Sequence, residues 1–148
     1  SYFRVKPEDM NEAIAAYAPD NSRSQIIHQG TNTIVLDAYN ANPSSMEAAL
    51  RNFEKMQSDS KIICIGDMAE LGDESAGEHK RIIDQLKKMD YKLLILVGKN
   101  FGAYANEIKS IHFENSNLAA DFFKKNLPEN SLVLIKGSRS SKMELIIN

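Results

Sequence analysis

Residues 33–46 of this chain read Thr33-Ile34-Val35-Leu36-Asp37-Ala38-Tyr39-Asn40-Ala41-Asn42-Pro43-Ser44-Ser45-Met46. The stretch begins as an apolar, β-branched run, which is typical of a buried strand, and it ends in polar groups just before a helical pattern. In open α/β sheets, ligands bind beyond the carboxyl ends of the strands, where loops enter helices. The polar residues of this junction therefore lie where a binding site is expected. The alternative is that residues 42–45 form only a turn and a helix cap, because Asn, Pro and Ser favour such positions for local reasons.

Strand-like and helical patterns alternate on both sides of this stretch. Two strand-like runs, 25–28 and 33–36, are separated by a short connection that contains Gly30, and together they predict a β-hairpin. The predicted strands downstream are 61–65, 92–97, 111–113 and 131–135. Five helices are predicted between and after them: one begins after Pro43, a second runs from about Glu74 to Met89, a third passes through Tyr104 and Ile108, a fourth contains Leu118, Phe122 and Phe123, and a fifth contains Met143 and Ile146. We therefore predict an α/β fold, a Rossmann-like three-layer sandwich whose sheet is mostly parallel, with an antiparallel hairpin at its amino-terminal side.

The composition is typical of a globular domain. The chain has 148 residues, of which 43% are hydrophobic and 26% are charged, and its formal net charge is −2. This balance gives no general attraction to nucleic acid or to anionic membranes, so we expect neither as a partner. Cys64, the only cysteine, lies in an apolar run and fits a small core residue in a reducing, cytosolic setting.

Four polar loops are predicted at one end of the sheet. They are residues 37–45, 66–73, 98–100 and 136–141. Parallel strands place their carboxyl ends at the same edge, so these loops can meet although they are far apart in sequence. Together they form one candidate site.

Two of these loops carry charged groups that suit a ligand. Lys136-Gly137-Ser138-Arg139-Ser140-Ser141 has two cations and three hydroxyls before a predicted helix, which favours an anion site. The alternative is a capped helix with solvated basic residues. Asp67 and Glu70 fit an ammonium group or a metal, or else they favour the N-terminus of the following helix.

Other residues give weaker or negative indications. Arg23, in a turn before the first strand, fits a nucleotide base or phosphate, although a lone loop arginine is usually solvated. The histidines have no partners at zinc-site spacing, so we assign no metal ligand. Neither G-x-x-x-x-G-K-[ST] nor G-x-G-x-x-G is present. The chain lacks the usual phosphate cradle, and we do not expect complete nucleotide chemistry within it.

Three stretches resemble the signature motifs of one family of bacterial cell-wall enzymes, and they occur in the family's order. They are residues 37–46, residues 66–72, and residues 136–140 with Met143-Glu144. On these motifs the chain resembles the carboxy-terminal domain of the Mur ligases, and the first motif is most similar to the members that use D-alanyl-D-alanine. The resemblance covers roughly residues 21–148. Residues 1–20 look like the end of the central ATP-binding domain and its linker.

The resemblance implies an ATP-dependent ligase of peptidoglycan synthesis in the cytoplasm. Such ligases have an amino-terminal domain for the UDP-sugar, a central domain with the P-loop and a Rossmann-like carboxy-terminal domain. ATP phosphorylates the terminal carboxylate of UDP-N-acetylmuramoyl-tripeptide, and the amine of D-alanyl-D-alanine attacks the acyl phosphate. The implied partners are these substrates and the other two domains, with Mg²⁺ held mainly by the central domain. The chain alone is then expected to be inactive.

The resemblance also assigns binding roles, but no catalytic residue, within this chain. The nucleotide set is Arg23, Asp37, Asn40 and Asn42. The dipeptide set is Asp67, Glu70, Ser138 and Arg139. Asp37 suits ribose hydroxyls and the asparagines suit the adenine side, whereas the dipeptide's amine favours a carboxylate and its carboxylate favours an arginine. Ser22 stands where the family often has glycine, so the backbone beside Arg23 can differ.

A second function remains open, namely a free-standing Rossmann-like module that binds a nucleotide or a small anion without catalysis. The missing phosphate-activating loop supports it. The coding sequence upstream of Ser1 distinguishes the two hypotheses, because a P-loop there favours the ligase and a start codon at Ser1 favours the module.

Overall fold

A mixed sheet forms the middle of the molecule. The computed structural model describes residues 25–38, 41–126 and 128–147. The strands are β1 (Gln25–Gln29), β2 (Asn32–Asp37), β3 (Lys61–Gly66), β4 (Leu93–Val97), β5 (Ile111–Phe113) and β6 (Leu132–Lys136), in the six-stranded order β1-β2-β6-β3-β4-β5. β1 and β2 pair antiparallel, and the other pairs are parallel. The predicted α/β fold, with a mostly parallel sheet and an amino-terminal hairpin, is confirmed.

The hairpin forms where its local residues predict it. Gln29 pairs with Asn32 across the turn, and Ile27 pairs with Ile34 further along. Gly30 in the connection has a φ of 61°, a left-handed conformation that glycine adopts without steric cost.

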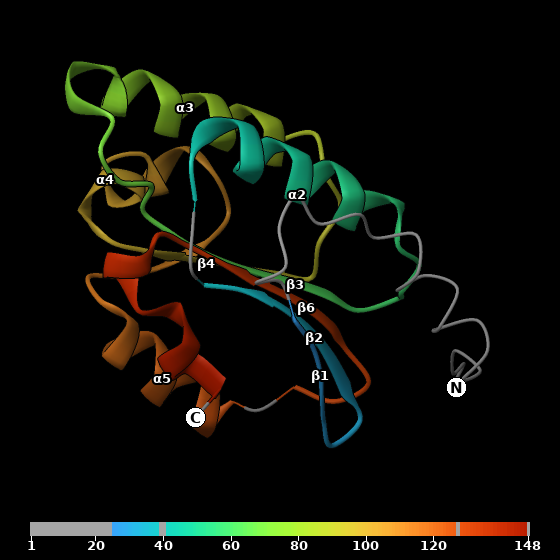
Figure 1. Cartoon of the computed structure of the whole chain (residues 1–148). Helices are drawn as coiled ribbons and strands as arrows, with labels where there is room; N and C mark the ends of the chain where they lie inside the picture. Colours follow the sequence, from blue (N-terminus) through green and yellow to red (C-terminus); the bar gives the residue numbers. More distant parts are fainter. Residues whose placement is uncertain (1–24, 39–40, 127, 148) are drawn as a thin grey trace.

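Helices cover both faces of the sheet and complete the three layers (Figure 1). α2 (Pro43–Lys55), α3 (Ser75–Leu86) and the short α4 (Lys99–Gly102) lie on one face, and α5 (Ser116–Lys125) lies on the other with the carboxy-terminal segment. Adjacent residues of a strand point to opposite faces, so Leu134 joins the core cluster under α2 and α3, while Val133 joins the cluster under α5. Within the described residues, no helix is long and apolar enough to cross a lipid bilayer.

The end of the chain differs from the single helix predicted there. Residues after β6 form two 3₁₀ helices, η3 (Arg139–Ser141) and η4 (Met143–Ile147). Lys142 lies between them with a φ of 51°. A residue with a Cβ in the left-handed region does not continue a right-handed helix, so the segment breaks there. Met143 and Ile146, which the predicted helix contains, are both buried.

Two other helices also differ in detail. The segment predicted through Tyr104 and Ile108 is α4 followed by the 3₁₀ helix η2 (Ala105–Glu107). The helix predicted from Glu74 begins as the 3₁₀ helix η1 (Gly72–Glu74), and α3 follows it. α5 is capped by Asn115, and of the apolar residues predicted in this helix Phe123 is buried whereas Leu118 is 46% exposed.

Candidate functional site

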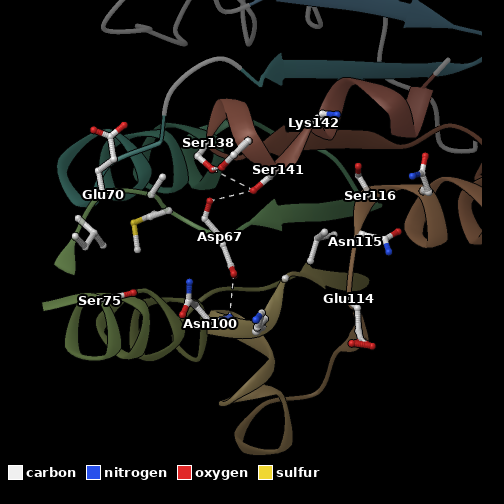
Figure 2. A pocket seen from close by; sticks show the side chains of 18 of the residues that line it. Asp67, Glu70, Ser75, Asn100, Glu114, Asn115, Ser116, Ser138, Ser141 and Lys142 are labelled. Carbon is white, nitrogen blue, oxygen red and sulfur yellow. Dashed lines mark hydrogen bonds between the residues drawn. The ribbon is translucent and has the colours of Figure 1, made fainter. Parts of the chain in front are cut away.

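Two adjoining cavities lie at the edge of the sheet where the parallel strands end. The first has a volume of about 700 Å³ and the second about 860 Å³. The residues that line both are Ala69, Glu70, Leu71, Ser138, Ser140 and Lys142, and we call them the shared wall. Figure 2 shows the first cavity, with Asp67 between Ser141 on one side and Asn100 on the other.

The four loops predicted to converge do converge here. The loops after β3, β4 and β6 line the first cavity, and Asn42, from the loop after β2, lines the second. Residues 114–117 also line the first cavity and were not predicted as part of the site. A signal for them exists in the sequence, because they follow the short strand β5, which runs parallel to β4 and so ends at the same edge.

Asp67 connects three loops of the first cavity. Its carboxylate accepts hydrogen bonds from the backbone N–H groups of Asn100 (2.9 Å) and Phe101 (3.0 Å), in the first turn of α4. Its backbone oxygen accepts from the Ser138 N–H (3.2 Å) and from the Ser141 hydroxyl (3.2 Å). The carboxylate therefore stabilises a helix N-terminus, which is one of the roles predicted for it, although the helix is α4 and not the following helix α3.

Two histidines, for which the sequence suggested no role, hold the same loops. His79 of α3 is completely buried. Its Nε2 accepts a hydrogen bond from the Met68 N–H (3.0 Å), so its proton lies on Nδ1, 2.7 Å from the Ser75 carbonyl oxygen. His112 of β5 lies with Nε2 2.7 Å from the carbonyl oxygen of Gly98, which can only accept, so His112 donates. Both rings fix backbone groups that surround the first cavity.

Asp37 and Lys136 form a buried ion pair at the ends of β2 and β6. The Lys136 Nζ donates to the Asp37 Oδ2 at 2.6 Å. The Lys136 side chain is 1% exposed and the Asp37 side chain is 5% exposed. Asp37 is not among the described residues that line either cavity. Lys136, one of the two cations in the predicted anion loop, therefore faces the interior, and the Asp37 carboxylate already has a charged structural partner.

Asn42 caps α2 and also lines the second cavity. Its side-chain oxygen accepts from the Ser45 N–H (2.8 Å), and the Ser45 Oγ accepts from the Asn42 N–H (3.1 Å). This reciprocal arrangement is a capping box. The turn-and-cap interpretation of residues 42–45 is thus correct, and Asn42 still lies where a ligand can reach it.

The remaining predicted residues are placed as follows. Glu70 and Ser138 belong to the shared wall, and Arg139 lines the second cavity. Arg23 and Asn40 lie outside the described residues. Since η3 and η4 replace the predicted final helix, the described part of the chain has no α-helix N-terminus after the loop 136–141. Among the described residues, no three His, Cys, Asp or Glu side chains are grouped as metal ligands.

The family model described as "Mur ligase, glutamate ligase domain" matches residues 22–139. The chain belongs to the Mur ligase family. The family predicted from the three motifs is confirmed, and the motifs lie on loops that meet at the two cavities.

Several proteins are similar to this Mur ligase domain. The UDP-N-acetylmuramoyl-tripeptide–D-alanyl-D-alanine ligase of Bacillus subtilis is 30% identical over 99% of the chain, and that of Rickettsia prowazekii is 30% identical over 91%. A crystal structure of MurF from Acinetobacter baumannii is similar to this chain with a TM-score of 0.74 and 28% sequence identity. The match covers 97% of this chain and 32% of the MurF chain. The fold is also similar to MurF ligase from Thermotoga maritima, solved in complex with ADP, with a TM-score of 0.68, 22% identity, and coverage of 84% of this chain and 29% of that one. The chain spans about a third of the length of the curated relatives, 34% and 31% for the first two.

Two motif glycines of this Mur ligase domain lie against Met143. A Cβ on Gly66 would lie 2.8 Å from the Met143 Sδ, and one on Gly137 would lie 2.5 Å from its Cγ. Such distances are too short for a Cβ, so glycine lets the ends of β3 and β6 approach the buried Met143. The buried Met143 side chain therefore anchors the segment next to Lys142, which belongs to the shared wall.

Proposed function

We propose that this chain is the carboxy-terminal domain of an ATP-dependent ligase that joins D-alanyl-D-alanine to UDP-N-acetylmuramoyl-tripeptide in peptidoglycan synthesis. The observation that carries the proposal is the convergence of three motif loops at two adjoining cavities. Relatives that are named as such ligases match nearly the whole chain, which supports the same assignment.

The proposed reaction needs two ligands held next to each other. ATP transfers its γ-phosphoryl group to the tripeptide carboxylate and leaves as ADP. The amine of the dipeptide then attacks the acyl phosphate, the amide bond forms and phosphate leaves. Orienting the amine against the acyl phosphate lowers the barrier, because the encounter becomes effectively unimolecular. Two cavities that share one wall suit a nucleotide and an amine substrate bound side by side.

The proposal assigns the rest of the protein as well. Residues 1–20 are the end of the central ATP-binding domain and its linker, and residues 21–148 are the carboxy-terminal domain. Mg²⁺ is held mainly by the central domain, and the enzyme works in the cytoplasm. The proposed nucleotide contacts are Arg23, Asp37, Asn40 and Asn42, and the proposed dipeptide contacts are Asp67, Glu70, Ser138 and Arg139.

The test is a phosphate-release assay on the full-length protein, with mass spectrometry of the muramoyl product. We expect phosphate release to require ATP, UDP-N-acetylmuramoyl-tripeptide and D-alanyl-D-alanine together, and to produce the pentapeptide. The 148-residue chain alone should release none, since it contains no P-loop motif. A full-length protein that binds nucleotide but forms no amide would instead establish the binding-module function.

A further inference from the structure

Two charged residues of the shared wall have an unusual backbone conformation. Glu70 has a φ of 61° and Lys142 a φ of 51°, and neither is glycine. Both side chains are exposed, and both residues line both cavities. In Figure 2 their side chains lie on either side of Ser138 and Ser141. A positive charge and a negative charge therefore flank the same short segment of wall.

The left-handed backbone at these positions is not what local structure favours. A side chain with a Cβ is disfavoured there, and glycine or asparagine is the usual residue. The Lys142 backbone is held at both ends, because its N–H donates to the Arg139 carbonyl (3.2 Å) and its carbonyl accepts from the Leu145 N–H (3.1 Å). Residues kept in such conformations cluster at ligand sites, where the surrounding structure imposes the strain. A long charged side chain at such a position suggests a ligand contact.

The charges of the shared wall are available to a ligand. Within the described part of the chain, Glu70 and Lys142 are the charged members of this wall, and neither side chain forms an ion pair or hydrogen bond with another described residue. The Asp67 carboxylate, by contrast, already accepts two backbone hydrogen bonds. A polyphosphate would be repelled by Glu70, whereas a small zwitterion needs one acceptor and one cation.

We propose that the shared wall binds the zwitterionic dipeptide, with Lys142 holding its carboxylate and Glu70 its ammonium group. This inference rests on the proposed ligase function and deepens it, because it adds Lys142 as a specificity residue and gives it the carboxylate contact expected of Arg139. An extended dipeptide spans about 7 Å between its termini, and Glu70 and Lys142 each line both cavities in which it would lie.

The experiment compares D-alanyl-D-alanine with its carboxamide, which lacks the negative charge, as substrates of the full-length enzyme. The wild type should prefer the free acid by roughly tenfold in KM, the typical effect of one charge-assisted contact. Lys142→Asn should raise the KM for the free acid to that for the amide, so that the preference disappears, while the KM for ATP is unchanged. Lys142→Arg should retain the preference, and Lys88→Asn, an exposed lysine outside both cavities, is the matched control.

The outcomes separate this inference from the proposed function. If Lys142→Asn keeps the wild-type preference, or if Arg139→Gln abolishes it instead, Lys142 does not bind the carboxylate. If the wild-type enzyme releases no phosphate with D-alanyl-D-alanine, the proposed function itself is wrong. Asparagine tolerates a positive φ, so the melting temperature of the Lys142→Asn chain should not fall. If this variant folds poorly, Lys142→Gly provides the same kinetic test, because glycine adopts a positive φ without steric cost.

Discussion

The Asp37 carboxylate lies 2.6 Å from the Lys136 ammonium group in the interior, so any contact with a nucleotide is additional to a structural role. Removing two charges from water costs several kcal/mol, and their attraction offsets this cost only while both are present. A substitution of Asp37 therefore affects folding before it reports on nucleotide binding.

We expect Asp37→Ala to lower the free energy of unfolding of the chain by about 3 to 5 kcal/mol, because the buried Lys136 loses this carboxylate. The double variant Asp37→Ala/Lys136→Met should be less destabilised than the sum of the single variants, since it removes both charges. Urea denaturation of the three variants measures the coupling, and additive effects would contradict it. A raised ATP KM in full-length Asp37→Ala with a normal melting temperature would make Asp37 a nucleotide contact without this structural role.

Cys64 gives a pH-dependent prediction from β3. Burial raises the pKa of the Cys64 thiol from its ordinary value of 9.0 to about 12. The unfolded chain therefore loses this proton at lower pH than the folded chain, so the thiol's contribution to stability is complete below pH 9.0 and is lost as the pH rises toward 12. Relative to Cys64→Ala, the wild type should lose about 1.4 kcal/mol of unfolding free energy per pH unit in that range. Urea titrations of both proteins on either side of pH 9.0 measure this loss, and parallel pH curves would disprove it.

The helices show which features a local sequence pattern predicts. α2 is fully described by neighbouring residues, because Asn42 caps it, Pro43 begins it and Phe53 lies on its buried face. α4 is determined by contacts that are distant in sequence. Its cap is Asp67, which is 33 residues before Asn100, and it ends at Gly102, where a Cβ would lie 2.4 Å from the His112 Nε2. No local pattern contains these contacts, so the predicted helix was too long.

The cap of α4 can be tested through Asp67 and Gly98. Asp67→Ala should lower the unfolding free energy by about 1 to 2 kcal/mol, since two N–H groups lose their acceptor. Gly98→Ala should cost more, because its φ is 107° and its Cβ would lie 2.4 Å from the Asp67 carboxylate. Hydrogen exchange at the amides of residues 100 and 101 should accelerate in both variants.

Gly77→Ala in α3 is the matched control, because a Cβ there meets nothing within 4 Å and it should be neutral or stabilising. If Gly98→Ala is as well tolerated as Gly77→Ala, the close approach of Asp67 and Gly98 does not determine the stability of α4.

The arrangement of the whole sheet explains why the location of the site was predictable from the sequence, whereas the side chains that lie next to each other within it were not. Alternating strands and helices imply parallel strands, and parallel strands are sufficient to bring the polar loops to one edge. They do not specify strand order. β6, the last strand in the described residues, lies between β2 and β3, and this position places Lys136 beside Asp37. The same insertion places Lys142 and Glu70 on the walls of the same two cavities, so neither the Asp37–Lys136 pair nor this shared wall follows from the sequence alone.

The exposure of the shared wall leads to a last prediction about the protein as a whole. Glu70 and Lys142 face solvent, where charge interactions are weak and screened by salt. A ligand-induced closure by other domains would exclude water and strengthen the same contacts. We therefore expect the 148-residue chain to bind D-alanyl-D-alanine at least about tenfold more weakly than the full-length enzyme with ATP and the muramoyl tripeptide present.

The affinity of the isolated chain should also fall as salt rises, because the Debye length shrinks from about 30 Å at 0.01 M to about 8 Å at 0.15 M ionic strength. NMR titration of the chain and calorimetry of the full-length protein, each at low and physiological salt, measure both effects. The Lys142→Asn chain should lose the part of the salt dependence that comes from the carboxylate contact and keep the part that comes from Glu70, whereas Lys88→Asn should keep all of it. Equal affinity for the isolated chain and the full-length enzyme would show that the dipeptide site is complete in this domain and that closure adds nothing to binding.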